Sequence, residues 1–205
     1  MDKKSKEMKL HKKSDGQHVG FENSLLLYLH DLVTLLAAIL LVLLLLFRIV
    51  IVSGPSMNTT LIDGDYLLLL SNNIYQNPKH GDIIVASKDN FKNGEPIIKR
   101  VIATEGQTVD IDFEAGIVYV DGVALEENYT LTPTNLAEGV QFPVVVAEGC
   151  LFVMGDNRNE SKDSRNPEIG QVDKREVLGK AIVLLLPGTD GGRTQPQYSR
   201  IGVLK

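Results

Sequence analysis

One serine with the potential for nucleophilic chemistry lies in the Gly/Pro-rich stretch Ser53–Leu61, which begins where a long apolar run ends. This serine is Ser56. A serine hydroxyl attacks a carbonyl carbon effectively only when a neighbouring base takes its proton. Taken alone, Ser56 is more typical of an ordinary loop residue, so the interpretation depends on whether the chain supplies a base.

The histidines are poor candidates for that base. His11, His18 and His30 all precede the core of the apolar run, so a membrane crossed by this run would separate them from Ser56. His80 follows the run, but its surroundings, Pro-Lys-His-Gly-Asp, are typical of a solvated turn. A Ser-His-Asp arrangement is therefore disfavoured.

Lys99 is the better candidate. It lies in the segment 97–103, which is rich in β-branched residues, and strand alternation places Ile97, Lys99 and Val101 on one face. Burial among apolar neighbours disfavours the ammonium form and lowers the pKa of a lysine. A lysine that is neutral near pH 7–8 can accept a proton from serine. The structural alternative is an edge-strand lysine that points into water.

A third polar feature is the charge-dense loop Gly155–Arg165, which directly follows the apolar segment Cys150–Met154. By composition alone it could be a solvated loop. Cys150 is the single cysteine, so the chain has neither a disulfide framework nor a multi-cysteine metal site, and its apolar context predicts a buried, inert thiol.

The apolar run predicts a membrane anchor. Residues 32–47 are uncharged, but a helix of this length spans only about 24 Å, so we extend the predicted span to 31–51 to cross a hydrocarbon core of about 30 Å. Arg48 would then extend its side chain toward the interface. Six lysines in the first thirteen residues predict a cytoplasmic N-terminus. The long polar region before the run favours an uncleaved signal anchor over a cleaved signal peptide.

Beyond the anchor, the pattern predicts a mainly β domain. Short alternating segments are separated by turns, with predicted strands at 66–70, 83–85, 97–103, 108–113, 116–120, 150–154 and 177–186. Asp121-Gly122 predicts a hairpin turn, and residues 126–148 predict an irregular excursion. The predicted organisation is a basic cytoplasmic tail at 1–30, the anchor at 31–51 and an exported catalytic domain at 52–205. The run 66–70 is expected to pack in the core, with lipid contact as the alternative.

Charge excludes one class of function. After residue 48 the chain carries 14 basic and 21 acidic residues. An acidic domain without a basic patch is a poor nucleic-acid binder, so we expect no nucleic-acid partner.

Three motifs together resemble the type I bacterial signal peptidases. Ser56-Met57, Lys99-Arg100-Val101 and the loop Gly-Asp-Asn-Arg-x-x-Ser-x-Asp-Ser-Arg at 155–165 match the motifs of that family in order and spacing, and Gly81-Asp82-Ile83-Ile84 resembles a further family strand. The resemblance extends from the anchor to about Leu186. It implies a partly open, barrel-like β domain with a Ser-Lys dyad.

The resemblance also implies roles for individual residues. Ser56 would be the nucleophile and Lys99 the general base, while Ser161 would hydrogen-bond and orient the lysine amine. Supporting roles fall on the remaining motif residues, with Asp163 and Arg165 as an ion pair, Asp156 as the partner of Arg100, Met57 lining the substrate groove, and Gly155 opening the loop motif.

Gly54 departs from one form of the family. Some members carry at this position a serine whose hydroxyl belongs to the oxyanion hole, whereas a glycine resembles the Gram-positive form. We expect the backbone N–H of Ser56, with help from Gly54 or a water, to stabilise the oxyanion. A lost donor that nothing replaces removes about 3 kcal/mol of transition-state stabilisation.

The implied function is the removal of signal peptides from exported preproteins at the outer face of the cell membrane, after small-x-small motifs. No metal or organic cofactor is expected. The implied partners are exported preproteins and membrane lipid, with the protein export channel as a candidate. Two alternatives remain, a Ser-Lys hydrolase similar to the self-cleaving repressor proteases and a non-catalytic membrane-anchored scaffold. The first would carry a DNA-binding helical domain, and the second would not need Ser56, Lys99 and Ser161 together.

Overall fold

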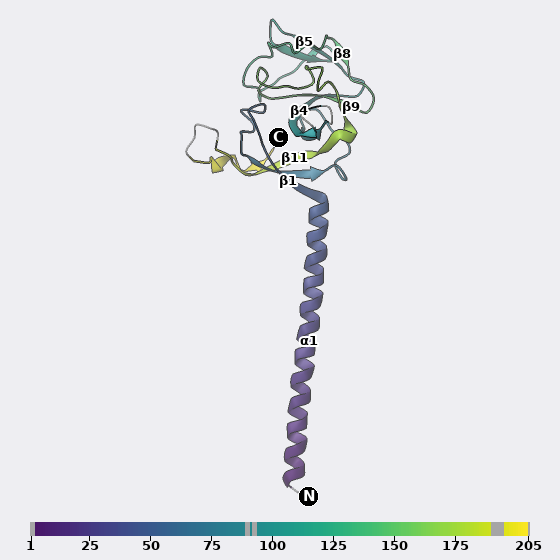
Figure 1. Cartoon of the computed structure of the whole chain (residues 1–205), viewed down its shortest axis with the longest axis vertical. Coiled ribbons are helices and arrows are strands. Elements are labelled where there is room, and N and C mark those ends of the chain that lie inside the picture. Colours follow the sequence, from purple (N-terminus) through teal and green to yellow (C-terminus); the bar gives the residue numbers. More distant parts are fainter. Residues whose placement is uncertain (1–2, 89–90, 92–93, 190–194, 205) are drawn as a thin grey trace. The chain divides into compact units, whose positions relative to one another are not determined.

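A computed structural model describes residues 3–88, 91, 94–189 and 195–204 of this chain. The chain forms two compact units, Met1–Leu45 and Leu46–Lys205. The first is a single helix, and the second is the mainly β body (Figure 1). The predicted fold class, one N-terminal helix followed by a mainly β domain, is confirmed.

Helix α1 runs from Lys3 to Leu46, and its segment Ser24–Leu46 is long and apolar enough to cross a membrane. The 23 residues of this segment have a mean hydropathy of 2.6, and none of the segment is buried within the protein. As a helix they extend about 35 Å, which exceeds the hydrocarbon core of about 30 Å.

The apolar helix differs from the predicted span at both ends. It starts seven residues before Asp31, and its helical part stops at Leu46, because Phe47–Ile51 forms strand β1. This strand pairs antiparallel with β2 from Phe47↔Leu70 to Ile51↔Tyr66. The sequence Phe-Arg-Ile-Val-Ile is apolar enough to extend a membrane helix, but its β-branched residues also favour a strand. Arg48 therefore lies in strand β1 and not in the apolar helix.

The larger sheet of the second unit has the strand order β1-β2-β11-β3-β4-β9-β10, with β12 also paired to β11. After β1, its strands are β2 (Tyr66–Ser71), β3 (Ile83–Ser87), β4 (Pro96–Thr104), β9 (Cys150–Met154), β10 (Val172–Asp173), β11 (Val177–Leu186) and β12 (Gly202–Val203). All the pairings are antiparallel. Short 3₁₀ helices, η2 (Lys174–Glu176) and η3 (Tyr198–Arg200), precede β11 and β12.

The smaller sheet has the order β7-β6-β5-β8. Its strands are β5 (Thr108–Asp112), β6 (Ile117–Val120), β7 (Val123–Ala124) and β8 (Val144–Val145). The predicted hairpin turn is present, with Asp121 at φ 51° and Gly122 at φ 78°. Within residues 126–148 the structure has one short strand, β8.

Three apolar clusters form the core of the β body. The cluster most relevant to the site surrounds Leu67, Leu69 and Val85 and includes Met57 and Leu61 from the turn after β1. The run 66–70 alternates, since Leu67 and Leu69 are fully buried while Tyr66, Leu68 and Leu70 face the other side of the sheet. The core therefore anchors the turn that contains Ser56.

Candidate active site

Ser56 lies in the turn that connects β1 to β2, and both ends of this turn are fixed. At its base, Val52 N–H donates to the Asp65 carbonyl (2.8 Å), and Gly64 N–H donates to the Val52 carbonyl (2.9 Å). Met57 and Leu61, which flank the tip of the turn, are 1% and 0% exposed. The turn is thus held from below by buried apolar side chains while Ser56 stays half-buried.

Lys99 comes from β4, which lies between β3 and β9, with Lys99 opposite Ile84 of β3. Its side chain is 5% exposed, so the predicted burial is present. Its Nζ lies 2.9 Å from Ser56 Oγ and donates to the Ile98 carbonyl at 3.0 Å. The fold therefore brings the amine to the hydroxyl from 43 residues away in sequence.

Arg100, the next residue on β4, forms the predicted pair with Asp156. Arg100 Nε and Nη2 donate to Asp156 Oδ1 and Oδ2 at 2.9 and 2.7 Å, and the two side chains are 3% and 0% exposed. Thr60, four residues after Ser56, donates its hydroxyl to the same carboxylate at 2.5 Å. Asp156 thus joins the lysine strand to the turn of the nucleophile.

Gly155 lets the loop 155–165 pack directly against that turn. A Cβ atom at Gly155 would lie 2.1 Å from Ser161 Oγ and 2.4 Å from the Ser56 carbonyl oxygen, which is closer than real atoms approach. Two residues further along the loop, the Asn157 N–H donates to the Ser56 carbonyl at 3.0 Å. A glycine is required here because backbone and side-chain atoms fill the space on both sides.

Asp163 and Arg165 form the predicted ion pair, and both are fully buried. Arg165 Nε and Nη2 donate to the two carboxylate oxygens, each at 2.8 Å. Asp163 also accepts from Gly155 N–H at 3.0 Å, and Arg165 donates to the Arg158 carbonyl at 2.6 Å. The pair therefore closes the loop on itself.

Glu138 also lies against Arg165, 3.1 Å from Nη2. Burial, and then the nearby charge of Asp163, raise the pKa of the Glu138 carboxyl group above its ordinary value. Arg165 is thus shared by two carboxyl groups, and this charge network extends from the loop into the excursion at 126–148.

The structure does not contain the predicted hydrogen bond between Ser161 and the lysine amine. Ser161 is 3% exposed, and its hydroxyl has no hydrogen-bond partner among the residues that the structure describes. Lys99 Nζ instead contacts Ser56 Oγ and the Ile98 carbonyl. The amine is thus directed at the nucleophile itself.

The geometry differs from two further predictions. Met57 is 1% exposed and belongs to the apolar core, so it packs inward and does not line an open groove. Gly54 N–H donates to Asp63 Oδ1 at 2.8 Å, so it does not point freely toward an oxyanion. Gly54 has φ +89°, a backbone conformation that favours glycine.

His80 takes no part in this arrangement. Its Nδ1 atom lies 2.8 Å from the Ile102 carbonyl oxygen, so its ring contacts the backbone of β4 beyond the lysine.

Sequence reasoning missed a clamp from the excursion. Glu127 accepts from both terminal nitrogens of Arg158, at 2.7 and 2.5 Å, although Arg158 side-chain atoms are fully buried. The ring of Tyr129 lies 4.1 Å from Arg100 Cζ, and its hydroxyl donates to Glu127 at 2.9 Å. Burial, and then the charge of Glu127, raise the pKa of Tyr129 above its ordinary value. In the sequence, the one feature that pointed to this contact was Arg158, an arginine of the loop 155–165 to which the resemblance gave no role.

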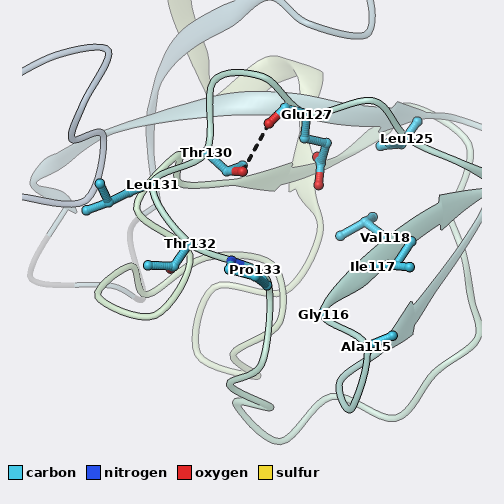
Figure 2. A pocket seen from close by; sticks show the side chains of 10 residues that line it. All are labelled: Ala115, Gly116, Ile117, Val118, Leu125, Glu127, Thr130, Leu131, Thr132 and Pro133. Atoms are coloured by element: carbon cyan, nitrogen blue, oxygen red, sulfur yellow. Dashed lines mark hydrogen bonds between the residues drawn. The ribbon is translucent and has the colours of Figure 1, made fainter.

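A separate hollow of about 300 Å³ lies between the start of β6 and this excursion (Figure 2). Glu127 and Thr130 line one side, and the Thr130 hydroxyl donates to the Glu127 carbonyl at 3.0 Å. Ile117 and Val118 line the opposite side. None of the residues that line this hollow belongs to the Ser56–Lys99 pair.

Comparison with known proteins gives a consistent result. The family model described as "Signal peptidase, peptidase S26" matches residues 25–186. A signal peptidase I from Bacillus licheniformis is 34% identical over 174 residues, which cover 81% of this chain and 91% of that protein. A probable signal peptidase I-1 from Synechocystis is 37% identical over 150 residues, which cover 69% and 72%. A crystal structure of a signal peptidase I from Enterococcus faecalis is 31% identical, with a TM-score of 0.42, and covers 51% of this chain and 96% of that one.

Proposed function

This chain belongs to the signal peptidase family, peptidase S26, and is a serine peptidase that removes signal peptides; on that premise we propose that Ser56 and Lys99 are its catalytic dyad. The single observation that carries the proposal is the 2.9 Å distance between Lys99 Nζ and Ser56 Oγ. This distance lies within the range that proton transfer requires.

In the proposed reaction, Lys99 accepts the proton of Ser56 as Oγ forms a bond to the scissile carbonyl carbon. The resulting ammonium gives its proton to the amine that leaves when the C–N bond breaks. Lys99 then takes a proton from the water that attacks the acyl-enzyme, and it returns this proton to Ser56 Oγ as the ester C–O bond breaks and the acid product leaves. The 5% exposure of Lys99 supports this role, because burial disfavours the charged form of an amine.

The backbone N–H of Ser56 is the proposed oxyanion donor. The Gly54 N–H is bound to Asp63, so it does not share this task in the proposed mechanism. The loop 155–165 has a positioning role, because Asn157 N–H holds the Ser56 carbonyl and Asp156 holds both Arg100 and Thr60. The Asn157 bond holds the Ser56 carbonyl in place, and the Asp156 bonds link the turn to β4.

The test uses the full chain in detergent or lipid with a secretory preprotein as substrate. Ser56→Ala and Lys99→Ala should each abolish cleavage, whereas Lys79→Ala, which removes an exposed lysine, should not change it. Mass spectrometry of the released products should place the cut after a small-x-small sequence. Cleavage at the normal rate by either dyad variant would refute the proposal and favour the scaffold alternative.

The pH dependence of the rate gives a second test of the same dyad. The rate should rise with pH through a group that titrates well below the value of about 10.4 for free lysine. A profile of the same shape in a slow Lys99 variant would assign the titration to another group.

We also propose that Ser24–Leu46 crosses the cell membrane once, with the N-terminus in the cytoplasm and the β body outside. Its 23 apolar residues and the six lysines before them support this orientation. External protease should then digest the β body in intact spheroplasts and leave the N-terminal tail protected. Digestion of the tail instead would reverse the orientation.

Membrane lipid is the proposed partner of one face of the larger sheet. Ile49, Ile51 and Tyr66 on this face are 64%, 55% and 40% exposed, and Ile51 pairs with Tyr66. Strand β1 follows the apolar helix without a linker, so chain connectivity keeps this face within a few residues of the membrane segment. A fragment of residues 46–205 should bind liposomes, and Ile49→Glu with Ile51→Glu should abolish that binding. Unchanged binding would exclude this face.

A further inference from the structure

The segment that follows the β11 strand lies outside the part of the chain matched by the signal peptidase family model, which ends at residue 186. Its residues 195–204 include η3 and β12. The β12 strand pairs with β11 through Val183↔Val203 and Leu184↔Gly202, and Leu204 N–H donates to the Ile182 carbonyl at 3.0 Å. These contacts hold the segment against the C-terminal half of β11, and the contacts of Arg200 place η3 beside the turn that contains Ser56.

Arg200, the last residue of η3, binds that turn at two points. Its Nη1 and Nη2 atoms donate to Asp65 Oδ1 and Oδ2 at 2.9 and 2.6 Å, and Nη2 also donates to the Thr60 carbonyl at 3.1 Å. The Asp65 side chain is fully buried, and that of Arg200 is 18% exposed. A lysine could supply the charge, but it could not reproduce the planar two-point contact.

The turn begins at Val52 and ends at Asp65, and Asp65 closes it. Its Oδ2 atom accepts from Ile62 N–H at 2.8 Å, its Oδ1 atom accepts from Gly188 N–H at 2.7 Å, and its carbonyl accepts from Val52 N–H at 2.8 Å. Arg200 supplies the positive charge that balances this buried carboxylate. Removal of one partner from a buried pair leaves an uncompensated charge, which the turn would have to move to solvate.

Thr60 connects the Arg200 contact to the proposed Ser56–Lys99 dyad. Its carbonyl accepts from Arg200, while its hydroxyl donates to Asp156, the partner of Arg100. Arg100 follows Lys99 on β4, and Thr60 follows Ser56 in the turn. A shift of Thr60 would therefore alter both sides of the Ser56–Lys99 contact.

We propose that Arg200 is a positioning residue for the nucleophile. Its contacts with Asp65 and Thr60, which we call the clip, hold the Ser56 turn in its reactive arrangement. This inference rests on the proposed role of Ser56. Misplacement of a reacting atom by about 1 Å can lower a rate about 100-fold, so the loss of this clip should appear in kcat. Substrate binding by the rest of the site should be preserved.

The test compares Arg200→Ala, Arg200→Lys and Arg175→Ala in the full chain, with kcat and KM measured on a preprotein well below the melting temperature. Arg175 is the matched control, since it also binds a carboxylate with two nitrogens but its side chain is 90% exposed. We expect kcat to fall at least tenfold in Arg200→Ala with KM within about twofold, and to fall less in Arg200→Lys. Methylguanidinium at millimolar concentration should restore part of the lost rate to Arg200→Ala alone.

The rates are divided by the folded fraction, measured from thermal unfolding of each variant. A normal kcat per folded molecule in Arg200→Ala would overturn the inference, because Arg200 would then contribute only to stability. Equal losses in Arg175→Ala would also overturn it. Ser56→Ala is assayed in parallel, since activity in that variant would refute the proposed dyad, whereas its inactivity beside a normal Arg200→Ala would refute only the clip.

Discussion

Two Asp-x-Arg segments of this chain make the same local contacts in opposite environments. In each, the arginine backbone N–H and side chain both bind the aspartate two residues earlier, as Asp163–Arg165 and as Asp173–Arg175. Asp163 and Arg165 are fully buried, whereas the Arg175 side chain is 90% exposed. These two segments thus form the same local pair, and the surrounding fold determines its consequences.

The buried pair has additional partners that the exposed pair lacks in the described structure. Asp163 holds Gly155 N–H, and Arg165 holds the carbonyls of Arg158 and Leu136. Through Gly155 the pair controls how closely the loop 155–165 approaches Ser56. The exposed pair instead caps the short helix η2, where Asp173 and Glu176 form a capping box. The comparison indicates that the same Asp-x-Arg contact supports the candidate active site only where it is buried.

Removal of one buried partner should have the largest effect on this comparison. Arg165→Ala leaves the Asp163 carboxylate buried without its countercharge, so we expect a loss of about 3–5 kcal/mol in the free energy of unfolding. Urea unfolding at pH 7 measures this loss. Arg175→Ala is the matched control and should lower the urea midpoint only slightly. Similar midpoints for all three proteins would show that burial does not distinguish the two pairs.

A substitution at Gly155 tests the same loop without removing a charge. Gly155→Ala places a methyl group where Ser161 Oγ and the Ser56 carbonyl would lie 2.1 and 2.4 Å away. The loop must move away from the Ser56 turn, so kcat should fall about 100-fold. Steady-state assays on a preprotein measure this change, and thermal unfolding reports the accompanying loss of stability. A normal kcat would show that the approach of the loop to Ser56 does not matter for the reaction.

Ser161 gives a smaller and more selective test. Its buried hydroxyl has no hydrogen-bond partner among the described residues, so it is available to the lysine amine once Ser56 Oγ has engaged the substrate. We propose that Ser161 takes up this orienting role during the reaction. Ser161→Ala should then lower kcat about tenfold, with KM nearly unchanged and stability hardly altered. A change confined to KM would contradict the orienting role.

The parts of the fold that the sequence predicted are those that depend on local alternation. The strands at 83–85, 97–103 and 150–154 combine short apolar runs with clear turn boundaries, and each occurs in the structure. The end of the apolar helix α1 was not predictable in this way. Residues 47–51 are suited to either a helix or a strand, and the pairing with β2, a non-local contact, decides between them.

In the candidate site, too, the motifs predicted some features, while others depend on non-local contacts. The motifs predicted that Ser56 and Lys99 come together, and the pairing of Arg100 with Asp156. They did not predict that Met57 packs into the core, because the direction of a side chain in a turn depends on the packing around it. Nor did they reveal Glu127 or Arg200, whose partners lie 31 and 135 residues away in sequence and leave no local pattern.

The exposed pair provides the smallest expected effect, and pH isolates it. The side chain and then the backbone N–H of Arg175 lower the pKa of Asp173 from its usual value to about 2. A carboxyl group whose pKa is lower in the folded state stabilises the protein above its unfolded pKa of about 3.9, and this contribution disappears as the pH falls through about 2. Because the pair is open to solvent, salt should weaken the contribution further.

Asp173→Asn removes the charge and keeps a residue that can cap η2. We expect a small decrease in melting temperature at pH 7 and low salt, which shrinks in high salt and also as the pH is lowered from 4 toward 2. Melting curves across this pH range at two salt concentrations measure it. A decrease that persists at low pH or in high salt would mean that the Asp173 charge is not its source. A decrease as large as that of Arg165→Ala would mean that exposure to solvent does not weaken an Asp-x-Arg pair in this protein.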